Sequence, residues 1–139
     1  MPSLVSGYMV KPNSDYRILV VDDTPSLLKL ANTILGRRCG YGIVTADSGN
    51  AAWEYLTSKG LTPDGKVDLV FTDHDMPNGN GSELVQMIRE DDRFKDLPII
   101  MVSGEHDNRD TPGIDHFIAR PYNMHHLIET VQQYLPKEL

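Results

Sequence analysis

Residues 67–81 read V-D-L-V-F-T-D-H-D-M-P-N-G-N-G, and this stretch decides the fold. The apolar run that starts at Val67 is typical of a strand buried on both faces, and it ends abruptly at the carboxylates Asp73 and Asp75. A Gly/Asn-rich turn follows, and a helical pattern begins near Ser82. In an α/β protein, ligands bind in the crevice beyond the carboxyl ends of the strands. Because a carboxylate there is costly to bury without a cation or hydrogen-bond donors, we expect the rest of the chain to supply those partners.

Four more short apolar runs repeat this pattern along the chain. They are Arg17–Val21, Gly42–Ala46, Ile99–Val102 and His116–Ala119. Strands that alternate with helices predict a parallel sheet covered on both faces, because right-handed crossovers place the helices there. The chain is therefore predicted to form an α/β, doubly wound (βα)5 sandwich.

The helical patterns between these runs differ in strength. Thr24 and Pro25 are a candidate N-cap and first helical residue, and apolar residues then recur at helical spacing to about Arg38. Caps are also predicted at Ser48 and at Asn123, where the last helix begins. The stretch 105–112 has no apolar stripe and closes on proline, so we expect a fourth helix that is short or irregular.

Length and composition indicate one globular domain. The chain has 139 residues, of which 40% are hydrophobic and 24% are charged. Residues 1–16 show no periodicity and are predicted to form a flexible N-terminal tail, residues 17–136 the domain, and residues 137–139 a C-terminal tail. No DNA-binding or enzymatic output domain is expected in this chain.

The charge and the apolar runs exclude several classes of partner. The formal net charge of -7 argues against nucleic acid and against an anionic membrane surface. No apolar run is long enough to span a bilayer, and no signal sequence is recognisable, so membrane insertion is not expected. The single cysteine, Cys39, excludes an intrachain disulfide and fits the reducing cytoplasm, where we expect the protein.

Polar side chains follow four of the five predicted strands. Asp22 and Asp23 follow the first, Asp73 ends the third, Ser103 follows the fourth and Arg120 the fifth. Three carboxylates at one sheet edge repel one another unless a divalent cation lies among them, and oxygen ligands at that density suit Mg²⁺. A hydroxyl and a guanidinium are groups that hold a phosphoryl group. These residues predict an Mg²⁺ site with an aspartate that accepts a phosphoryl group.

The same residues make the chain resemble the receiver domain of two-component response regulators, from about residue 17 to residue 135. The motifs that carry the resemblance are V-V-D-D ending at Asp23, D-x-x-M-P-x-x-x-G from Asp73 to Gly81, the pair Ser103-Gly104 and the pair Arg120-Pro121. The resemblance implies a flavodoxin-like, five-stranded parallel sheet of the chemotaxis type, with strand order 2-1-3-4-5. It also implies that the bond before Pro121 is cis.

The resemblance assigns a role to each matching residue. Asp73 would be the phosphoacceptor, and Ser103 and Arg120 would act on its phosphoryl group. Ser103 would also reorient on phosphorylation together with Phe117, which stands where the family keeps an aromatic switch residue. Mg²⁺ would be held by Asp22, Asp23, Asp73 and the backbone carbonyl of Asp75.

Two departures from the family pattern are visible. Arg120 stands where the family almost always has lysine, and a planar, forked guanidinium does not replace an ammonium conservatively. We hypothesise that phosphorylation survives this exchange and that coupling to the output surface is weakened. The fourth βα unit is also shorter than usual, and the family commonly uses that helix as a partner and dimer surface. The connection 57–66, by contrast, is longer than usual and is interpreted as a surface insertion.

The function implied is that of a phospho-accepting receiver in a two-component or phosphorelay system. A sensor histidine kinase or histidine phosphotransfer protein would transfer a phosphoryl group to Asp73 with Mg²⁺, and a protein-interaction surface would switch. Such a domain assists its own phosphorylation and dephosphorylation and is not otherwise an enzyme. Two alternatives remain open: a pseudo-receiver that binds protein independently of phosphorylation, and an Mg²⁺-dependent phosphohydrolase built on the D-x-D that starts at Asp73.

Overall fold

The main sheet has five parallel strands, which the computed structural model places in the order β4-β3-β5-β6-β7. The model describes residues 3–5, 8–10, 12–77 and 80–135. The strands are β3 (Arg17–Val21), β4 (Gly42–Ala46), β5 (Leu69–Asp73), β6 (Ile99–Ser103) and β7 (His116–Ala119). Counted by βα unit, this is the order 2-1-3-4-5, which confirms the doubly wound, flavodoxin-like prediction.

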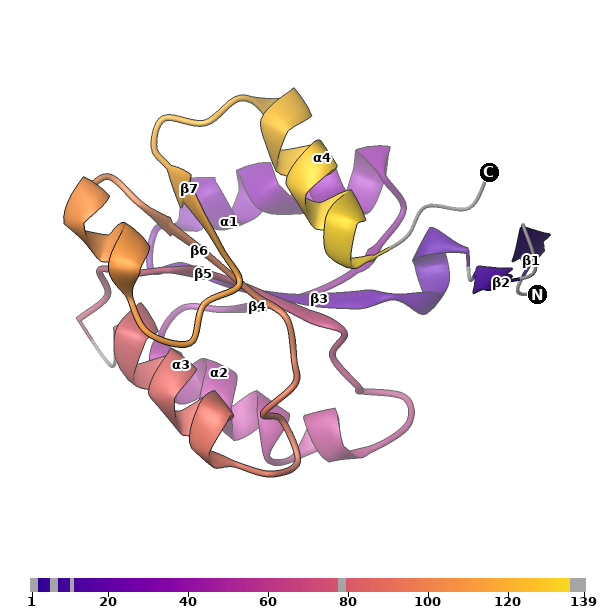
Figure 1. Cartoon of the computed structure of the whole chain (residues 1–139), viewed down its shortest axis with the longest axis horizontal. Coiled ribbons are helices and arrows are strands. Elements are labelled where there is room, and N and C mark those ends of the chain that lie inside the picture. Colours follow the sequence, from indigo (N-terminus) through magenta and orange to yellow (C-terminus); the bar gives the residue numbers. More distant parts are fainter. Residues whose placement is uncertain (1–2, 6–7, 11, 78–79, 136–139) are drawn as a thin grey trace.

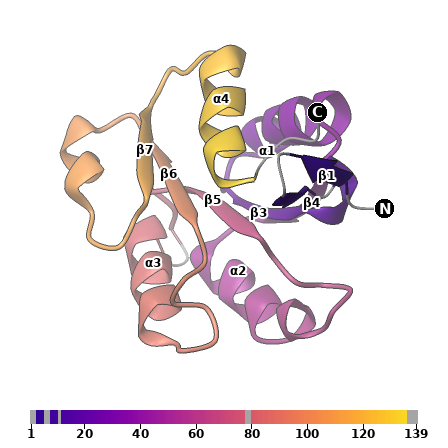
Figure 2. The same ribbon diagram turned by 45° about the vertical axis from the view of Figure 1, so that its right-hand side comes forward.

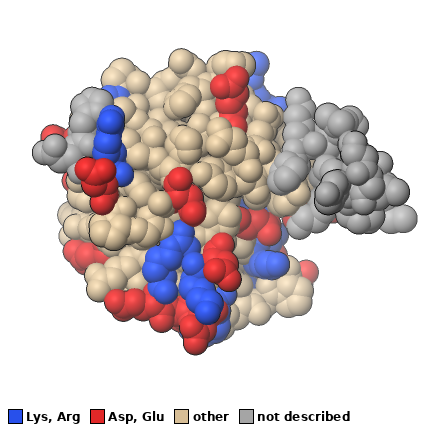
Figure 3. Space-filling model, in the orientation of Figure 1, with Lys and Arg blue, Asp and Glu red and all other residues tan. Residues whose placement is uncertain are grey.

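Helices cover both faces of this sheet, as Figures 1 and 2 show. One layer contains α1 (Pro25–Ala31), which continues as a π-helix, η2 (Asn32–Arg38), and α4 (Met124–Tyr134). The other layer contains α2 (Gly49–Leu56) and α3 (Gly81–Glu90). Acidic and basic side chains intermix over the α2/α3 layer in Figure 3. Within the described ranges, no helix combines the length and apolarity that crossing a bilayer requires.

The strands are buried on both faces because their apolar residues are continuous. In β6, Ile100 and Val102 pack into the core under α1 and α4, while Ile99 and Met101 pack into the core under α2 and α3. Each of these four side chains is fully buried. Burying one such side chain stabilises the fold by about 1.5–3 kcal/mol. The two cores therefore make the middle of the sheet rigid. The rigid sheet in turn fixes the positions of the polar residues at the strand ends.

Side-chain caps start three of the helices, whereas Thr24 occupies its predicted N-cap position without a side-chain cap bond. Ser48 accepts a hydrogen bond from Ala51 N–H (3.0 Å) and Asn123 accepts one from His126 N–H (2.7 Å), as predicted. Thr24 makes no side-chain cap bond; its own N–H instead donates to Asp22 Oδ1 at 3.0 Å. Asp22 thus accepts the N–H of the N-cap residue itself, while the backbone oxygen of Thr24 accepts from Leu27 N–H and Leu28 N–H.

The fourth βα unit has no α-helix, which confirms the prediction for this stretch. Between β6 and β7 the chain forms only a short 3-10 helix, η4 (His106–Asp110). The bond between Arg120 and Pro121 is cis, as the family resemblance implied. The C-terminal residues 137–139 lie outside the described residues.

The N-terminal segment contains regular structure that the sequence analysis missed. Strands β1 (Ser3–Val5) and β2 (Tyr8–Val10) pair antiparallel, and a 3-10 helix, η1 (Asn13–Asp15), precedes β3. A two-residue apolar run, Leu4-Val5, and a three-residue run, Tyr8–Val10, on either side of a Ser-Gly pair are the available signal for this hairpin. The runs are shorter than the strands that such patterns usually predict, which explains the omission.

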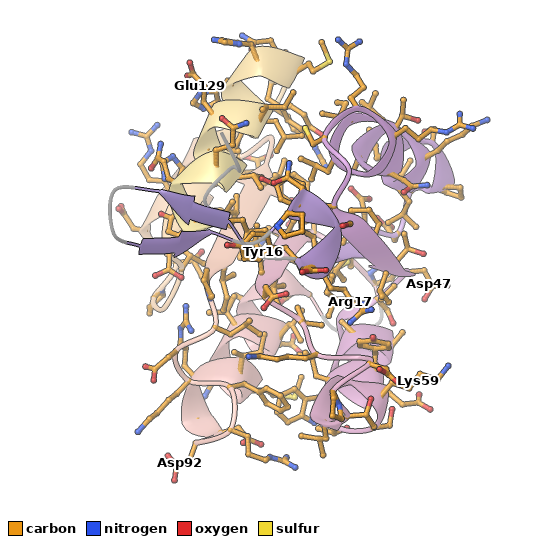
Figure 4. The ribbon with its side chains drawn as sticks, turned by 90° about the vertical axis from the view of Figure 1, so that its right-hand side faces the viewer. Tyr16, Arg17, Asp47, Lys59, Asp92 and Glu129 are labelled. Carbon is orange, nitrogen blue, oxygen red and sulfur yellow. The ribbon has the colours of Figure 1, made fainter. Side chains whose placement is uncertain are left out.

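The insertion at 57–66 lies at the end of the sheet where the strands begin. It contains a 3-10 helix, η3 (Lys59–Leu61), and Figure 4 views this end, with Tyr16 and Arg17 of the β3 start near the middle. Tyr55 Oη donates to Gly65 O at 2.8 Å, and Arg17 Nη1 donates to Lys66 O at 3.1 Å. The insertion is therefore tied to the fold at the end opposite Asp73.

Candidate functional site

Parallel register brings the polar strand ends to one edge of the sheet. Val21 pairs with Thr72 and Asp73 pairs with Val102, so Asp22, Asp73 and Ser103 follow their strands at nearly the same level. Arg120 follows β7, and its N–H donates to Ser103 O at 2.9 Å. Asp22, Asp73 and Arg120 continue the strand positions that face the α1/α4 layer, whereas Ser103 continues those that face the α2/α3 layer. The structure thus brings the ends of these strands to one edge of the sheet, while the roles of their residues stay predictions.

Three carboxylates form a compact oxygen cluster. Asp22, Asp23 and Asp73 each offer a carboxylate oxygen, and these oxygens lie within 4.8 Å of one another. Asp22 and Asp73 are only 4% and 5% exposed, whereas Asp23 is open to solvent. Receiver domains bind Mg²⁺ through such acidic residues, and a hard cation that prefers oxygen ligands and keeps part of its water shell fits this set.

Arg120 joins the two buried carboxylates. Its Nη1 donates to Asp73 Oδ1 at 3.0 Å, and its Nη2 donates to Asp22 Oδ2 at 2.6 Å. Hydrogen bonds between two charged groups are about twice as strong as neutral ones. The Nε of Arg120 is buried and has no hydrogen-bond partner among the residues that the structure describes. The guanidinium thus compensates both acids while its Nε–H stays unused.

The surroundings of Asp73 raise its pKa to about 6. Burial is the largest cause, because removal from water disfavours the charged form. Arg120 opposes this shift, while the negative charge of Asp22 adds to it. The carboxyl is thus mostly ionised at neutral pH, as a nucleophile must be, although its charge is incompletely solvated.

Ser103 is held by the chain that follows it. Its hydroxyl oxygen accepts hydrogen bonds from Glu105 N–H (3.0 Å) and from Asn108 Nδ2 (2.8 Å). Ser103 is fully buried. Sequence reasoning missed Asn108, because a polar residue in an irregular segment carries no periodic signal. An amide five positions after a strand-end serine is the one feature that could have indicated it.

The remaining predicted residues lie near the cluster in different ways. The side chain of Asp75 is 63% exposed and lies 2.7 Å from His74 Nδ1, while the metal-binding role of its backbone carbonyl stays a prediction. Phe117 lies on β7, half-buried against the core under α2 and α3. Gly81 starts α3, and a Cβ there would clash with the backbone oxygen of Asp73. Residues 78 and 79 of the motif lie outside the described residues.

Comparison with known proteins places this arrangement among signalling domains. The family model described as the response regulator receiver domain matches residues 18–132. Chemotaxis protein CheY1 of Helicobacter pylori is 32% identical over 121 residues, which cover 84% of this chain and 94% of that protein. The CheY homolog of Campylobacter jejuni is 30% identical over 124 residues, covering 86% and 92% respectively.

A solved structure extends the likeness to three dimensions. Response regulator TrrA from Thermotoga maritima, solved in complex with Mg(2+)-BeF, is 32% identical to this chain. The two align with a TM-score of 0.74 over 86% of this chain and 99% of that one. This chain therefore shares its fold with a response regulator that was solved in complex with Mg(2+)-BeF.

Proposed function

The chain belongs to the response regulator receiver domain family, and on that premise we propose that Asp73 accepts a phosphoryl group in a two-component or phosphorelay system. The observation that carries the proposal is the placement of Asp73. Its buried carboxylate lies beside two further carboxylates and a guanidinium at the carboxyl edge of the sheet. This set of groups suits in-line transfer, in which positioning and charge neutralisation do most of the work.

The transfer step forms one bond and breaks one. A carboxylate oxygen of Asp73 attacks the phosphorus of a phosphohistidine on a sensor kinase or phosphotransfer protein. The new O–P bond replaces the N–P bond, and the imidazole leaves with its electron pair. Asp22, Asp23, Asp73 and the Asp75 carbonyl would hold Mg²⁺, which neutralises phosphoryl charge when bound. The domain acts as an acceptor that assists its own phosphorylation and dephosphorylation.

Arg120 has to exchange partners during this step. In the resting protein its Nη1 donates to the Asp73 oxygen. Once that carboxylate becomes an acyl phosphate, the phosphoryl oxygens carry the negative charge and attract the guanidinium. The unpartnered Nε provides a further donor for them. Arg120 therefore takes the part that lysine has in the family, through a different donor geometry.

The readout would be a shift in the fourth and fifth βα units. Ser103 ends β6, and Arg120 follows β7, so a phosphoryl group bound by both pulls on neighbouring strands. The segment η4 and Phe117 lie on the same two units. A downstream protein would recognise the population in which these units have rearranged.

Intact-mass measurement after incubation with Mg²⁺ and acetyl phosphate tests the proposal. We expect a labile adduct of one phosphoryl group on the wild type, and none on Asp73→Asn. Asp75→Asn is the matched control, because it removes an exposed neighbouring carboxylate and keeps the backbone; it should still form the adduct.

Two other results would overturn the proposal. Absence of an adduct on all three proteins would favour a phosphorylation-independent binding module, a reading supported by the way Arg120 already bridges the acidic pair. Turnover of phosphoesters without a stable adduct would favour a phosphohydrolase.

A further inference from the structure

The hydroxyl of Ser103 has only one hydrogen-bonding direction left. A serine hydroxyl has one donor and two acceptor lone pairs. In this protein Glu105 N–H and Asn108 Nδ2 both donate to the oxygen, at 3.0 Å and 2.8 Å. Both acceptor sites are therefore in use, and what the hydroxyl can still offer is its proton. Phosphoryl oxygens accept hydrogen bonds and do not donate them, so they match that remaining direction.

Asn108 is itself fixed in place by its backbone. Its N–H donates to Glu105 O at 3.1 Å, and its carbonyl accepts from Thr111 N–H (3.1 Å) and from Thr111 Oγ1 (2.6 Å). The residue is half-buried in the middle of η4. The Asn108 amide thus extends from a defined turn of η4 to the end of β6.

We propose that Asn108 is a positioning residue for the phosphoryl site: its amide directs the Ser103 hydroxyl as a donor toward a phosphoryl group on Asp73 and links that group to η4. The inference rests on the proposed function of Asp73. The inference assigns a role to the shortened fourth βα unit. There the hydrogen bond between Asn108 and Ser103 couples the site to the segment, as a full helix would otherwise do. The donor order runs from Asn108 to Ser103 to the phosphoryl oxygen.

Substitution of Asn108 by aspartate tests this order. A carboxylate only accepts, so in Asn108→Asp the Ser103 proton would turn toward residue 108 and be lost to the phosphoryl group. With Mg²⁺ and beryllium fluoride as a non-covalent phosphoryl mimic, we expect calorimetry to show about tenfold weaker binding, the scale of one charge-assisted hydrogen bond. Asn108→Ala frees a lone pair without adding an acceptor and should weaken binding less.

A double-mutant cycle with Ser103→Ala separates the hydrogen bond from the added charge. If Asn108 acts through Ser103, the aspartate substitution costs no further affinity in the Ser103→Ala background; an equal loss in both backgrounds overturns the inference. The Asn108 side-chain NH₂ resonances should also shift on beryllium fluoride binding in the wild type and not in Ser103→Ala. Unfolding midpoints in urea, matched among the variants, verify that each one folds.

The same titration keeps the two proposals apart. Equal affinities for wild type and Asn108→Asp would overturn the role of Asn108 and leave the function of Asp73 intact. Failure of the wild type to bind beryllium fluoride with Mg²⁺ would overturn the proposed function itself.

Discussion

Two arginines of similar exposure occupy opposite parts of the molecule and have different surroundings. The side chains of Arg89 and Arg120 are 23% and 24% exposed, so exposure does not distinguish them. Arg89, in the last turn of α3, has a partner for each of its three nitrogens. It donates to Gly113 O (2.8 Å), Lys95 O (2.8 Å), Leu97 O (2.6 Å) and Asp115 Oδ2 (2.8 Å).

Arg120, by contrast, bonds to acids that could be neutralised in another way. Its partners are the carboxylates of Asp22 and Asp73, and its Nε has none. Carbonyl oxygens in loops have few substitutes for the guanidinium that binds them, whereas paired carboxylates can exchange it for a metal ion. Arg89 therefore fixes structure, whereas Arg120 is poised to be exchanged.

The largest effect should come from removing each arginine and adding Mg²⁺. Arg120→Ala leaves two buried carboxylates unpaired, and we expect a loss of about 3 kcal/mol in the free energy of unfolding at pH 7.5 without metal. Millimolar Mg²⁺ should restore much of it, since a ligand that binds only the folded state stabilises it. Arg89→Ala should lose about 2–3 kcal/mol, whether or not Mg²⁺ is present. Urea unfolding measures the free energy of unfolding of both variants with and without Mg²⁺. Restoration of Arg89→Ala stability by Mg²⁺ would contradict the distinction between the two arginines.

A second prediction concerns Asp73 and pH. Its pKa is about 6 in the folded protein against an ordinary value of 3.8, so between these values the folded state binds a proton that the unfolded state does not. Wild-type stability therefore falls as pH rises from about 4 to 6. Asp73→Asn removes this cost and should be about 1–3 kcal/mol more stable than the wild type above pH 6, with the gap closing below pH 4. Asp75→Asn, an exposed control, should show no such gap, and a gap independent of pH would contradict the assignment.

A smaller effect is expected when Arg120 becomes lysine. An ammonium is a point charge that cannot present the fork by which Arg120 reaches both carboxylates. Arg120→Lys should therefore bind Mg²⁺ about tenfold more tightly, as measured by calorimetry, because one competing charge-assisted hydrogen bond is lost. The substitution conserves the positive charge. An Mg²⁺ affinity of Arg120→Lys equal to that of the wild type would therefore show that the two guanidinium hydrogen bonds do not compete with the metal.

The smallest effect should come from a third arginine, on the surface. Arg93 makes two side-chain bonds to Asp91 and lowers the pKa of that carboxyl to about 2. The Arg93 side chain is 51% exposed to water and salt, so its bonds to the half-buried Asp91 contribute little stability. Arg93→Ala should leave the urea midpoint within experimental error, and a shift as large as that of Arg89→Ala would contradict this account of surface ion pairs.

The sequence was sufficient to predict the features that depend on residue type and spacing. Continuous apolar runs such as Ile99–Val102 predict buried parallel strands, and parallel strands bring Asp22, Asp73 and Ser103 to one edge. These inferences succeed because they follow from periodicity and strand direction, which the chain encodes locally. The irregular fourth helix was predictable for the same reason, because the stretch 105–112 has no apolar stripe at helical spacing.

Features that depend on side-chain direction were not predictable. Whether the Arg120 guanidinium binds the carboxylates of Asp22 and Asp73 or points outward depends on distances between strands. The sequence carries no signal for those distances. The Asn108 bond to Ser103 forms through an irregular turn, where no period relates position to direction. Thr24 occupies the N-cap position as predicted, but a cap bond depends on the direction of its side chain, and that side chain makes none.

The insertion at 57–66 offers an attachment point for a reporter. Pro63 and Asp64 are exposed, and the loop lies at the opposite end of the sheet from Asp73. Exposed loop tips tolerate inserted domains best. A fluorescent domain joined there would leave the acidic edge and η4 untouched, so the protein could be labelled without a change at that edge.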